Sequence, residues 1–102
     1  MRKRARIDDN QREIVAALRA VGAQVQSLAT IGDGCPDILV YWKDRTFTYD
    51  GLHLMEIKDG AKPPSKRRLT PAEADFATRW PVEVVCNVRE ALAVIGIDTD
   101  LC

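Results

Sequence analysis

The sequence predicts a mixed α/β fold with the element order α-β-β-β-α-β-α. Helix signals lie near the start of the chain, after its middle and at its end, and short apolar segments lie between them. Turn residues separate the two middle strands, which favours an antiparallel meander. A helix separates the last two strands, which makes that connection a crossover.

The first helix is predicted to begin at Asp8 or Asp9, either of which is a suitable cap, and to end at Gly22. Its apolar face repeats with helical spacing at Ile14, Ala17, Leu18 and Val21. Residues 23–30, AQVQSLAT, alternate loosely and predict a first strand. The polar side chains of this strand indicate an edge position or a half-exposed face.

The middle of the chain is predicted to form the meander. After a loop at residues 31–36, residues 37–42 are apolar on both faces, which is typical of a central strand. Residues 52–58, LHLMEIK, predict the next long strand. The connection between them is predicted to hold a turn at 43–46, a short strand at 47–49 and a tight turn at Asp50 and Gly51.

The segment 59–69, DGAKPPSKRRL, predicts an exposed loop because it carries glycine, two prolines and four basic residues. A helix is predicted to follow, with Thr70 as its cap, Pro71 at its first position and Glu73 closing a capping box. This helix is expected to run to about Trp80.

The end of the chain predicts one more strand and one more helix. Residues 82–87, VEVVCN, place Val82, Val84 and Cys86 on one face of the strand. The helix over residues 88–96 has Asn87 as its cap and Gly96 as its stop.

The composition is that of one soluble globular domain spanning residues 1–102. Its 46% hydrophobic and 29% charged residues are enough for one core but not for two. The net charge is zero, so attraction to polyanions requires local clusters of Lys and Arg. Three cysteines without a Cys-x-x-Cys pair argue against a disulfide framework and a zinc site. With no signal peptide and no membrane-length apolar segment, a cytoplasmic location is expected.

Charged side chains interrupt the apolar middle strands. Glu56 and Lys58 are two positions apart on one strand, so they point to the same face of the sheet. If strands 37–42 and 52–58 pair antiparallel, Asp37 at the start of one comes near Glu56 at the end of the other. Two carboxylates with open positions suit Mg²⁺ or Mn²⁺, which keep several waters and bind phosphate. The sequence therefore predicts a divalent-metal site on these strands, with Lys58 beside it.

The pairing of Pro36-Asp37 with Glu56-Ile57-Lys58 resembles the PD-(D/E)xK nuclease superfamily, and the order α-β-β-β-α-β is similar to its core. The GCPD lead-in, the EIK strand, the basic loop and the LTPAE helix start most resemble the VRR-NUC group. That group includes small phage-type members that act as Holliday-junction resolvases. The match covers essentially the whole chain. It implies a restriction-endonuclease-like core, a mixed sheet flanked by helices, in a phage or bacterial host cytoplasm.

The resemblance also implies roles for particular residues. Asp37 and Glu56 would bind Mg²⁺ or Mn²⁺, the backbone carbonyl of Ile57 would add a ligand, and Lys58 would position or activate the attacking water. A carboxylate on the first helix often completes such sites, and Glu13 matches it as a catalytic residue and as a metal ligand through water. No Lys or Arg lies three or four residues from Glu13 to pair with it. The alternative for Glu13 is an ordinary solvated glutamate.

One position departs from the group. Where this chain has Glu73, the group often has Gln. The capping box accounts for Glu73 locally, and any further role, in the outer shell of the metal or at the nucleic acid, stays open.

Basic residues in the loop after the EIK strand are predicted to contact phosphates: Lys62, Lys66, Arg67 and Arg68. A neutral protein must concentrate its positive charge where the nucleic-acid backbone lies. The alternative is that these residues only keep an exposed segment soluble.

The expected function is a Mg²⁺- or Mn²⁺-dependent endodeoxyribonuclease that is structure-selective and cuts branched DNA such as Holliday junctions. Symmetric cutting of two strands requires two sites related by a two-fold axis, so a homodimer is expected. A helix face and the polar first strand are both open as its interface. Two other functions stay open: a catalytically inactive nucleic-acid-binding domain of the same fold, and a structural or protein-interaction domain with an incidental basic patch.

Overall fold

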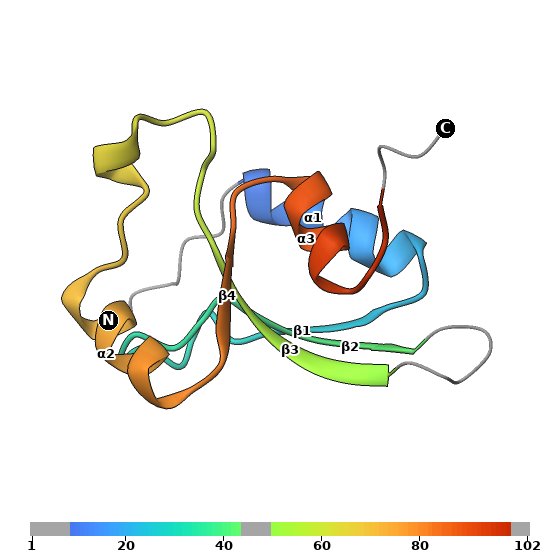
Figure 1. Ribbon diagram of the computed structural model, residues 1–102, viewed down its shortest axis with the longest axis horizontal. Coiled ribbons are helices and arrows are strands. Elements are labelled where there is room, and N and C mark those ends of the chain that lie inside the picture. Colours follow the sequence, from blue (N-terminus) through green and yellow to red (C-terminus); the bar gives the residue numbers. More distant parts are fainter. Residues whose placement is uncertain (1–8, 44–49, 99–102) are drawn as a thin grey trace.

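The computed structural model describes residues 9–43 and 50–98, which form a four-stranded sheet and three α-helices (Figure 1). In chain order the elements are α1 (Asp9–Ala20), β1 (Gln24–Ser27), β2 (Ile38–Lys43), β3 (Asp50–Ile57), the 3-10 helix η1 (Pro64–Lys66), α2 (Pro71–Arg79), β4 (Val82–Val85) and α3 (Val88–Val94). The predicted α/β order is therefore confirmed. The predicted short strand at residues 47–49 lies outside the described residues.

The strands lie side by side in the order β1-β2-β3-β4. β1 pairs antiparallel with β2, and β2 pairs antiparallel with β3, which is the predicted meander. β4 pairs parallel with β3 after the connection that contains α2, which is the predicted crossover. β1 is an edge strand and β2 an interior strand, as their polar and apolar side chains indicate.

Two details of the predicted meander differ from the structure. Asp50 and Gly51 belong to β3, where Gly51 pairs with Trp42, so the predicted tight turn at these residues is wrong. Asp-Gly often marks a hairpin turn, but here the pairing of β2 with β3 extends through the glycine. The first strand is also shorter than the predicted span of residues 23–30, and it ends at Ser27.

The hydrophobic core lies between one face of the sheet and the helices α1 and α3, which also contact each other (Figure 1). Its fully buried members come from the sheet, from α1 and from the region of α3: Ile14, Leu18, Ile38, Val40, Met55, Val85, Ala91 and Ile95. Burial of the Ile, Leu, Val and Met side chains among them stabilises the fold by roughly 1.5–3 kcal/mol each.

The opposite face of the sheet is only partly covered, because α1 and α3 both lie on the core side. Leu52 is 68% exposed and Val84 is 44% exposed on this face. A shallow hollow of about 150 Å³ lies over its β1–β3 part, lined by Gln24, Val25, Gln26, Leu39, Tyr41 and Leu52. Glu56 lies on the same face, by strand alternation, yet it is only 4% exposed.

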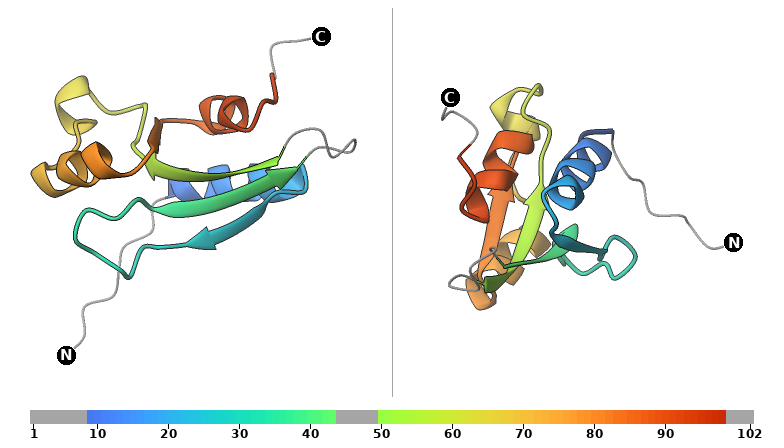
Figure 2. Two further views of the ribbon diagram at one scale, coloured as in Figure 1. Left: turned by 60° about the horizontal axis from the view of Figure 1, so that its bottom comes forward. Right: turned by 90° about the vertical axis from the view of Figure 1, so that its right-hand side faces the viewer.

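The end of the sheet at which β3 finishes is where α2 lies. The chain leaves β3, passes through η1 and returns to α2 at this same end (Figure 2). The start of α2 has the predicted capping box between Thr70 and Glu73, with Pro71 in the first turn. Asn87 caps α3 as predicted, and Gly96 follows that helix with a φ of 86°. None of the described helices is both long enough and apolar enough to cross a lipid bilayer.

Candidate active site

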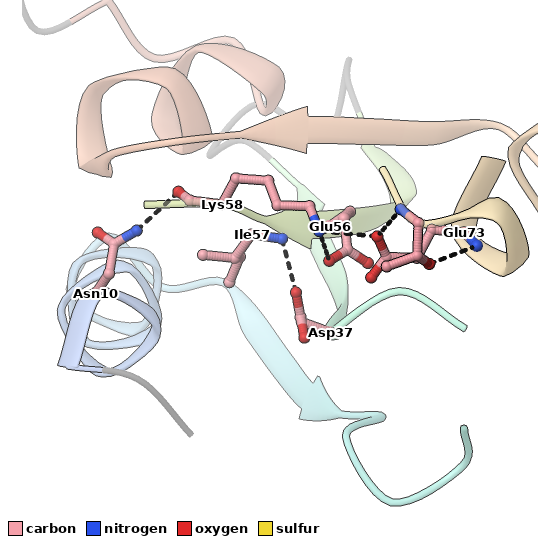
Figure 3. Close-up of polar contacts among 7 residues, drawn as sticks. Asn10, Asp37, Glu56, Ile57, Lys58 and Glu73 are labelled. Carbon is pink, nitrogen blue, oxygen red and sulfur yellow. Dashed lines mark hydrogen bonds and ion pairs between the residues drawn. The ribbon is translucent and has the colours of Figure 1, made fainter. Parts of the chain in front are cut away.

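Asp37 is held against the end of β3 by both its backbone and its side chain. Its N–H donates to the carbonyl oxygen of Met55 at 3.0 Å, and its Oδ2 accepts from the N–H of Ile57 at 2.7 Å (Figure 3). The Asp37 carbonyl accepts in turn from the N–H of Leu28 at 2.8 Å. Met55 and Ile57 are the two chain neighbours of Glu56. Asp37 therefore lies beside Glu56, as the antiparallel pairing predicts.

Glu56 is a buried carboxyl group with two acidic neighbours. Burial raises its pKa to about 8, and the charges of Asp37 and Glu73 and a hydrogen bond with Asp37 act in the same direction. The positive charge of Lys58 lowers the pKa but does not outweigh these effects. Around neutral pH Glu56 therefore tends to keep a proton. In Asp37 and Glu56, the acidic pair, the proton on Glu56 removes a negative charge that a cation would otherwise have to neutralise.

The Lys58 side chain points to the same side as Glu56, as the two-residue spacing predicts. Its Nζ lies 3.5 Å from Glu56 Oε2 and 2.8 Å from Glu73 Oε1, and 14% of the side chain is exposed. Burial alone would lower the pKa of Lys58, but the hydrogen bond to Glu73 and the charges of both glutamates outweigh it and raise the pKa. Lys58 is therefore an ammonium ion at neutral pH.

The backbone of Lys58 is hydrogen-bonded toward β4, on the side of β3 opposite to Asp37. Its N–H donates to the Val85 carbonyl at 2.9 Å, which continues the parallel pairing of β3 with β4. Asn10 Nδ2, from the first turn of α1, donates to the carbonyls of Lys58 at 2.9 Å and Cys86 at 3.3 Å. Asn10 thus ties α1 to the ends of both strands. No sequence pattern indicated this role, because DDNQ carries only a helix-start signal.

Glu73 belongs to this cluster as well as to the capping box. Its Oε1 accepts from the Thr70 N–H at 2.8 Å and from Lys58 Nζ at 2.8 Å. Burial would raise the pKa of Glu73, but the hydrogen bonds from Lys58 and Thr70 and the Lys58 charge outweigh it and lower the pKa. Glu73 is therefore a carboxylate at neutral pH. The prediction recognised its capping role and left its second role open.

The loop that leads to Asp37 packs directly on the start of α2. Gly34 has a φ of 78°, and a Cβ at this position would lie 2.3 Å from the Ala72 carbonyl oxygen and 2.8 Å from the Glu73 nitrogen. A side chain at position 34 is therefore excluded by backbone atoms. This contact fixes the position of α2, and of Glu73 on it, relative to Asp37.

Glu13 lies apart from these contacts. It is exposed on α1, and no described hydrogen bond or ion pair joins it to Asp37, Glu56 or Lys58. The polar side chain that α1 brings to the strand ends is that of Asn10. The role predicted for Glu13, as a catalytic residue and as a ligand through water, stays a prediction.

The basic loop, residues 59–69, leaves β3 directly after Lys58 and leads to α2 (Figure 1). Lys62, Lys66 and Arg68 are exposed, whereas Arg67 is half-buried. The Nε of Arg67 is buried and has no hydrogen-bond partner among residues 9–43 and 50–98. The loop therefore presents three exposed cations close in sequence to the acidic pair.

The donor set fits a hard divalent cation. Among the described residues, no group of three or more His, Cys, Asp or Glu side chains is arranged to hold a metal ion. Mg²⁺, however, is typically held by one or two carboxylates together with water and substrate phosphate. The N–H and C=O of one strand residue point to the same side, so we expect the Ile57 carbonyl to face the Asp37 side as its N–H does. Burial beside Asp37 and Glu73 raises the pKa of Glu56, and a bound divalent cation would neutralise the negative charge of the acidic pair.

Comparisons of the chain with protein-family models, with curated proteins and with solved structures find no match. The resemblance to the PD-(D/E)xK superfamily therefore rests on the sequence pattern and stays a prediction.

The pKa of Glu56 predicts an unusual pH dependence of stability in the metal-free protein. Its folded-state pKa of about 8 exceeds the value of 4.5 for a glutamate in the unfolded chain, so the stability it contributes is full below pH 4.5 and is lost as the pH rises through 8. We expect the Tm in EDTA to fall between about pH 5 and pH 8.5. Glu56→Gln, which cannot ionise, should flatten this dependence in the same thermal scans. An unchanged slope in Glu56→Gln would contradict the assignment.

Proposed function

We propose that this protein is a divalent-metal-dependent DNA endonuclease that hydrolyses phosphodiester bonds and prefers branched DNA. The observation that carries the proposal is the acidic pair, Asp37 and Glu56, beside the Lys58 ammonium. Burying two carboxylates together is costly unless a cation lies between them or one keeps a proton. A site of this kind is typical of a centre that binds a metal and a phosphate.

The residues of the site would have different roles in hydrolysis. Asp37, Glu56 and the Ile57 carbonyl would hold Mg²⁺ or Mn²⁺, which would polarise the scissile phosphate and acidify water. The Lys58 ammonium, with donors and no acceptor, orients the attacking water and offsets the negative charge that develops on the phosphate. Because Lys58 carries its proton at neutral pH, its part is electrostatic and it does not act as the base.

The basic loop supports DNA contact next to this site. Lys62, Lys66 and Arg68 are the exposed cations nearest in sequence to Lys58. Replacing all three with Gln should weaken DNA binding similarly for all sequences. It should also reduce the slope of log K against log salt by about 2–3, since each phosphate contact contributes about 0.9. Fluorescence anisotropy at several salt concentrations measures this slope. The slope of an Arg12→Gln variant, exposed on α1, is the control and should stay unchanged.

A homodimer is part of the proposal. One acidic pair cuts one strand, so paired cuts in a four-way junction need two copies related by a two-fold axis. Light scattering of the purified chain, alone and with junction DNA, measures the mass directly. A monomer in both conditions would leave single-strand nicking as the activity.

The deciding experiment is incubation with labelled four-way junction, flap and linear duplex in Mg²⁺, in Mn²⁺ and in EDTA. We expect cleavage of branched substrates in either metal and none in EDTA. Absence of cleavage of every substrate in both metals would contradict the enzyme. Metal-independent binding without cleavage would instead indicate a nucleic-acid-binding domain.

A further inference from the structure

A single carboxylate oxygen links the start of α2 to the end of β3. Glu73 Oε1 accepts from the Thr70 N–H and from Lys58 Nζ, each at 2.8 Å (Figure 3). The first contact is half of a capping box, and the Thr70 Oγ1 accepts the other half from the Glu73 N–H at 3.1 Å. The capping box thus holds the Glu73 side chain in position independently of Lys58. The Lys58 ammonium therefore bonds to an acceptor that the helix start has already ordered.

The start of α2, which carries Glu73, is held in place by the loop before Asp37. Gly34, in the loop before Asp37, packs so closely on Ala72 and Glu73 that even a Cβ is excluded. The position of Glu73 is therefore set relative to the loop that supplies Asp37. The Glu73 N–H donates to Thr70 at the start of α2, and the Glu73 side chain makes the contact between α2 and Lys58.

Lys58 has two acidic neighbours, and they differ in distance. Its Nζ is 3.5 Å from Glu56 and 2.8 Å from Glu73, so the contact with Glu73 is the shorter one. A lysine side chain has four flexible carbons, and ordering it costs conformational entropy. If Glu56 were the sole partner, the ammonium would lose its anchor whenever Glu56 turned toward a cation. Glu73 is an anchor that lies outside the acidic pair.

We propose that Glu73 is a positioning residue that holds the Lys58 ammonium beside the acidic pair during the reaction. This inference rests on the proposed nuclease function. Glu73 acts through Lys58 and need not touch the substrate. A carboxylate suits this task better than an amide, because a charge-assisted hydrogen bond to an ammonium is about twice as strong as a neutral one. The capping box and the Lys58 anchor are two uses of one side chain.

The competing explanation is that Glu73 only caps α2. Three variants separate the two. Glu73→Ala removes the cap bond and the anchor, and Glu73→Gln keeps an oxygen acceptor for both but loses the charge. Asn87→Ala removes the cap of α3, where Asn87 Oδ1 accepts from the Glu90 N–H at 2.8 Å, and leaves the Lys58 contacts intact. Asn87→Ala is therefore the control for lost helix capping.

The first readout needs no activity. A buried, ion-paired lysine ammonium exchanges its protons slowly and gives its own ¹H–¹⁵N signal, which Lys58→Met identifies by its disappearance. We expect this signal in the wild-type protein and in Asn87→Ala, a shifted signal in Glu73→Gln, and no signal in Glu73→Ala. The same Lys58 signal in Glu73→Ala as in the wild type would overturn the inference.

The second readout is cleavage of junction DNA in Mg²⁺, with kcat and KM measured separately. We expect Glu73→Ala to lower kcat by on the order of 10- to 100-fold, because a misplaced catalytic group is costly, and Glu73→Gln to lower it less. KM should stay the same or fall, since a negative charge near the DNA is lost. Asn87→Ala should lower the Tm and leave kcat unchanged.

The outcomes distinguish the two proposals. A wild-type protein that cuts no DNA defeats the nuclease function, whatever the variants do. A wild-type protein that cuts DNA, together with a Glu73→Ala variant of unchanged kcat, overturns the positioning role alone. An equal loss of kcat in Asn87→Ala and Glu73→Ala would also overturn it, because general loss of helix capping would then be the cause.

Discussion

Asp37→Asn is expected to abolish DNA cleavage while leaving the fold intact. Asp37 Oδ2 accepts from the Ile57 N–H at 2.7 Å, and the amide oxygen of Asn can accept the same hydrogen bond. The local structure at the end of β3 is therefore kept, and the loss is one negative charge of the acidic pair. If that charge holds the divalent cation, kcat should fall by on the order of 10³-fold, the scale on which preorganised electrostatic groups contribute.

Two further measurements separate a loss of catalysis from a loss of folding or of DNA binding. The Tm of Asp37→Asn should be within a few degrees of the wild-type value, so that loss of activity is not loss of fold. Its affinity for junction DNA in EDTA should be equal or higher, because a negative charge is removed from the proposed DNA-binding side. Activity within about tenfold of wild type would show that the acidic pair does not hold the essential cation.

Gly34→Ala is expected to be the most destabilising single methyl addition in the loop before β2. The new Cβ would lie 2.3 Å from the Ala72 carbonyl oxygen, which is backbone and cannot rotate away as a side chain does. The positive φ of 78° adds strain of about 1–2 kcal/mol for a residue with a Cβ. Clash and strain together should lower the stability by roughly 3 kcal/mol or more, which corresponds to a Tm decrease of about 15 °C or a failure to fold.

Gly32→Ala is the matched control. Gly32 has the same φ of 78°, but a Cβ there meets nothing within 4 Å. Its loss should be limited to the backbone strain of about 1–2 kcal/mol. Thermal unfolding of both variants therefore isolates the contact between the loop and α2. Equal Tm values for the two variants would mean that the loop does not press on the start of α2.

The sequence predicted the elements of this fold because most of its signals are local. Asn87, Thr70 and Glu73 lie at helix starts, where capping bonds join residues three positions apart. The apolar pattern of residues 37–42 correctly indicated an interior strand. The Asp50-Gly51 turn was wrong because a dipeptide signal is weaker than the pairing of Gly51 with Trp42 across the hairpin.

The closeness of Asp37 and Glu56 was predictable from the geometry of strand pairing, although the two residues are far apart in the sequence. Strand alternation puts Glu56 and Lys58 on one face, and antiparallel pairing brings Asp37 to the same end of the sheet. Both rules need only the order of the strands. The contacts of Asn10 and Glu73 escape such rules, because they depend on how α1 and α2 are placed against the sheet.

The close packing of Gly34 against α2 was likewise not predictable from the sequence. The segment IGDGCP predicts a loop, and its two glycines look alike in the sequence. In the structure Gly34 is in contact with α2, whereas Gly32 is in open space. The contact spans residues far apart in the chain, so the spacing of loop residues carries no information about it.

Titration with Mn²⁺ followed by NMR tests whether Asp37 and Glu56 together hold a hard divalent cation. Mn²⁺ is paramagnetic and broadens the signals of nearby amides. We expect the first ion to bind to broaden the amides of Asp37, Glu56, Ile57 and Lys58, and Mg²⁺ in excess to restore them. Broadening confined to other acidic residues, such as Asp75 or Glu83, or no broadening at all, would contradict this cation site.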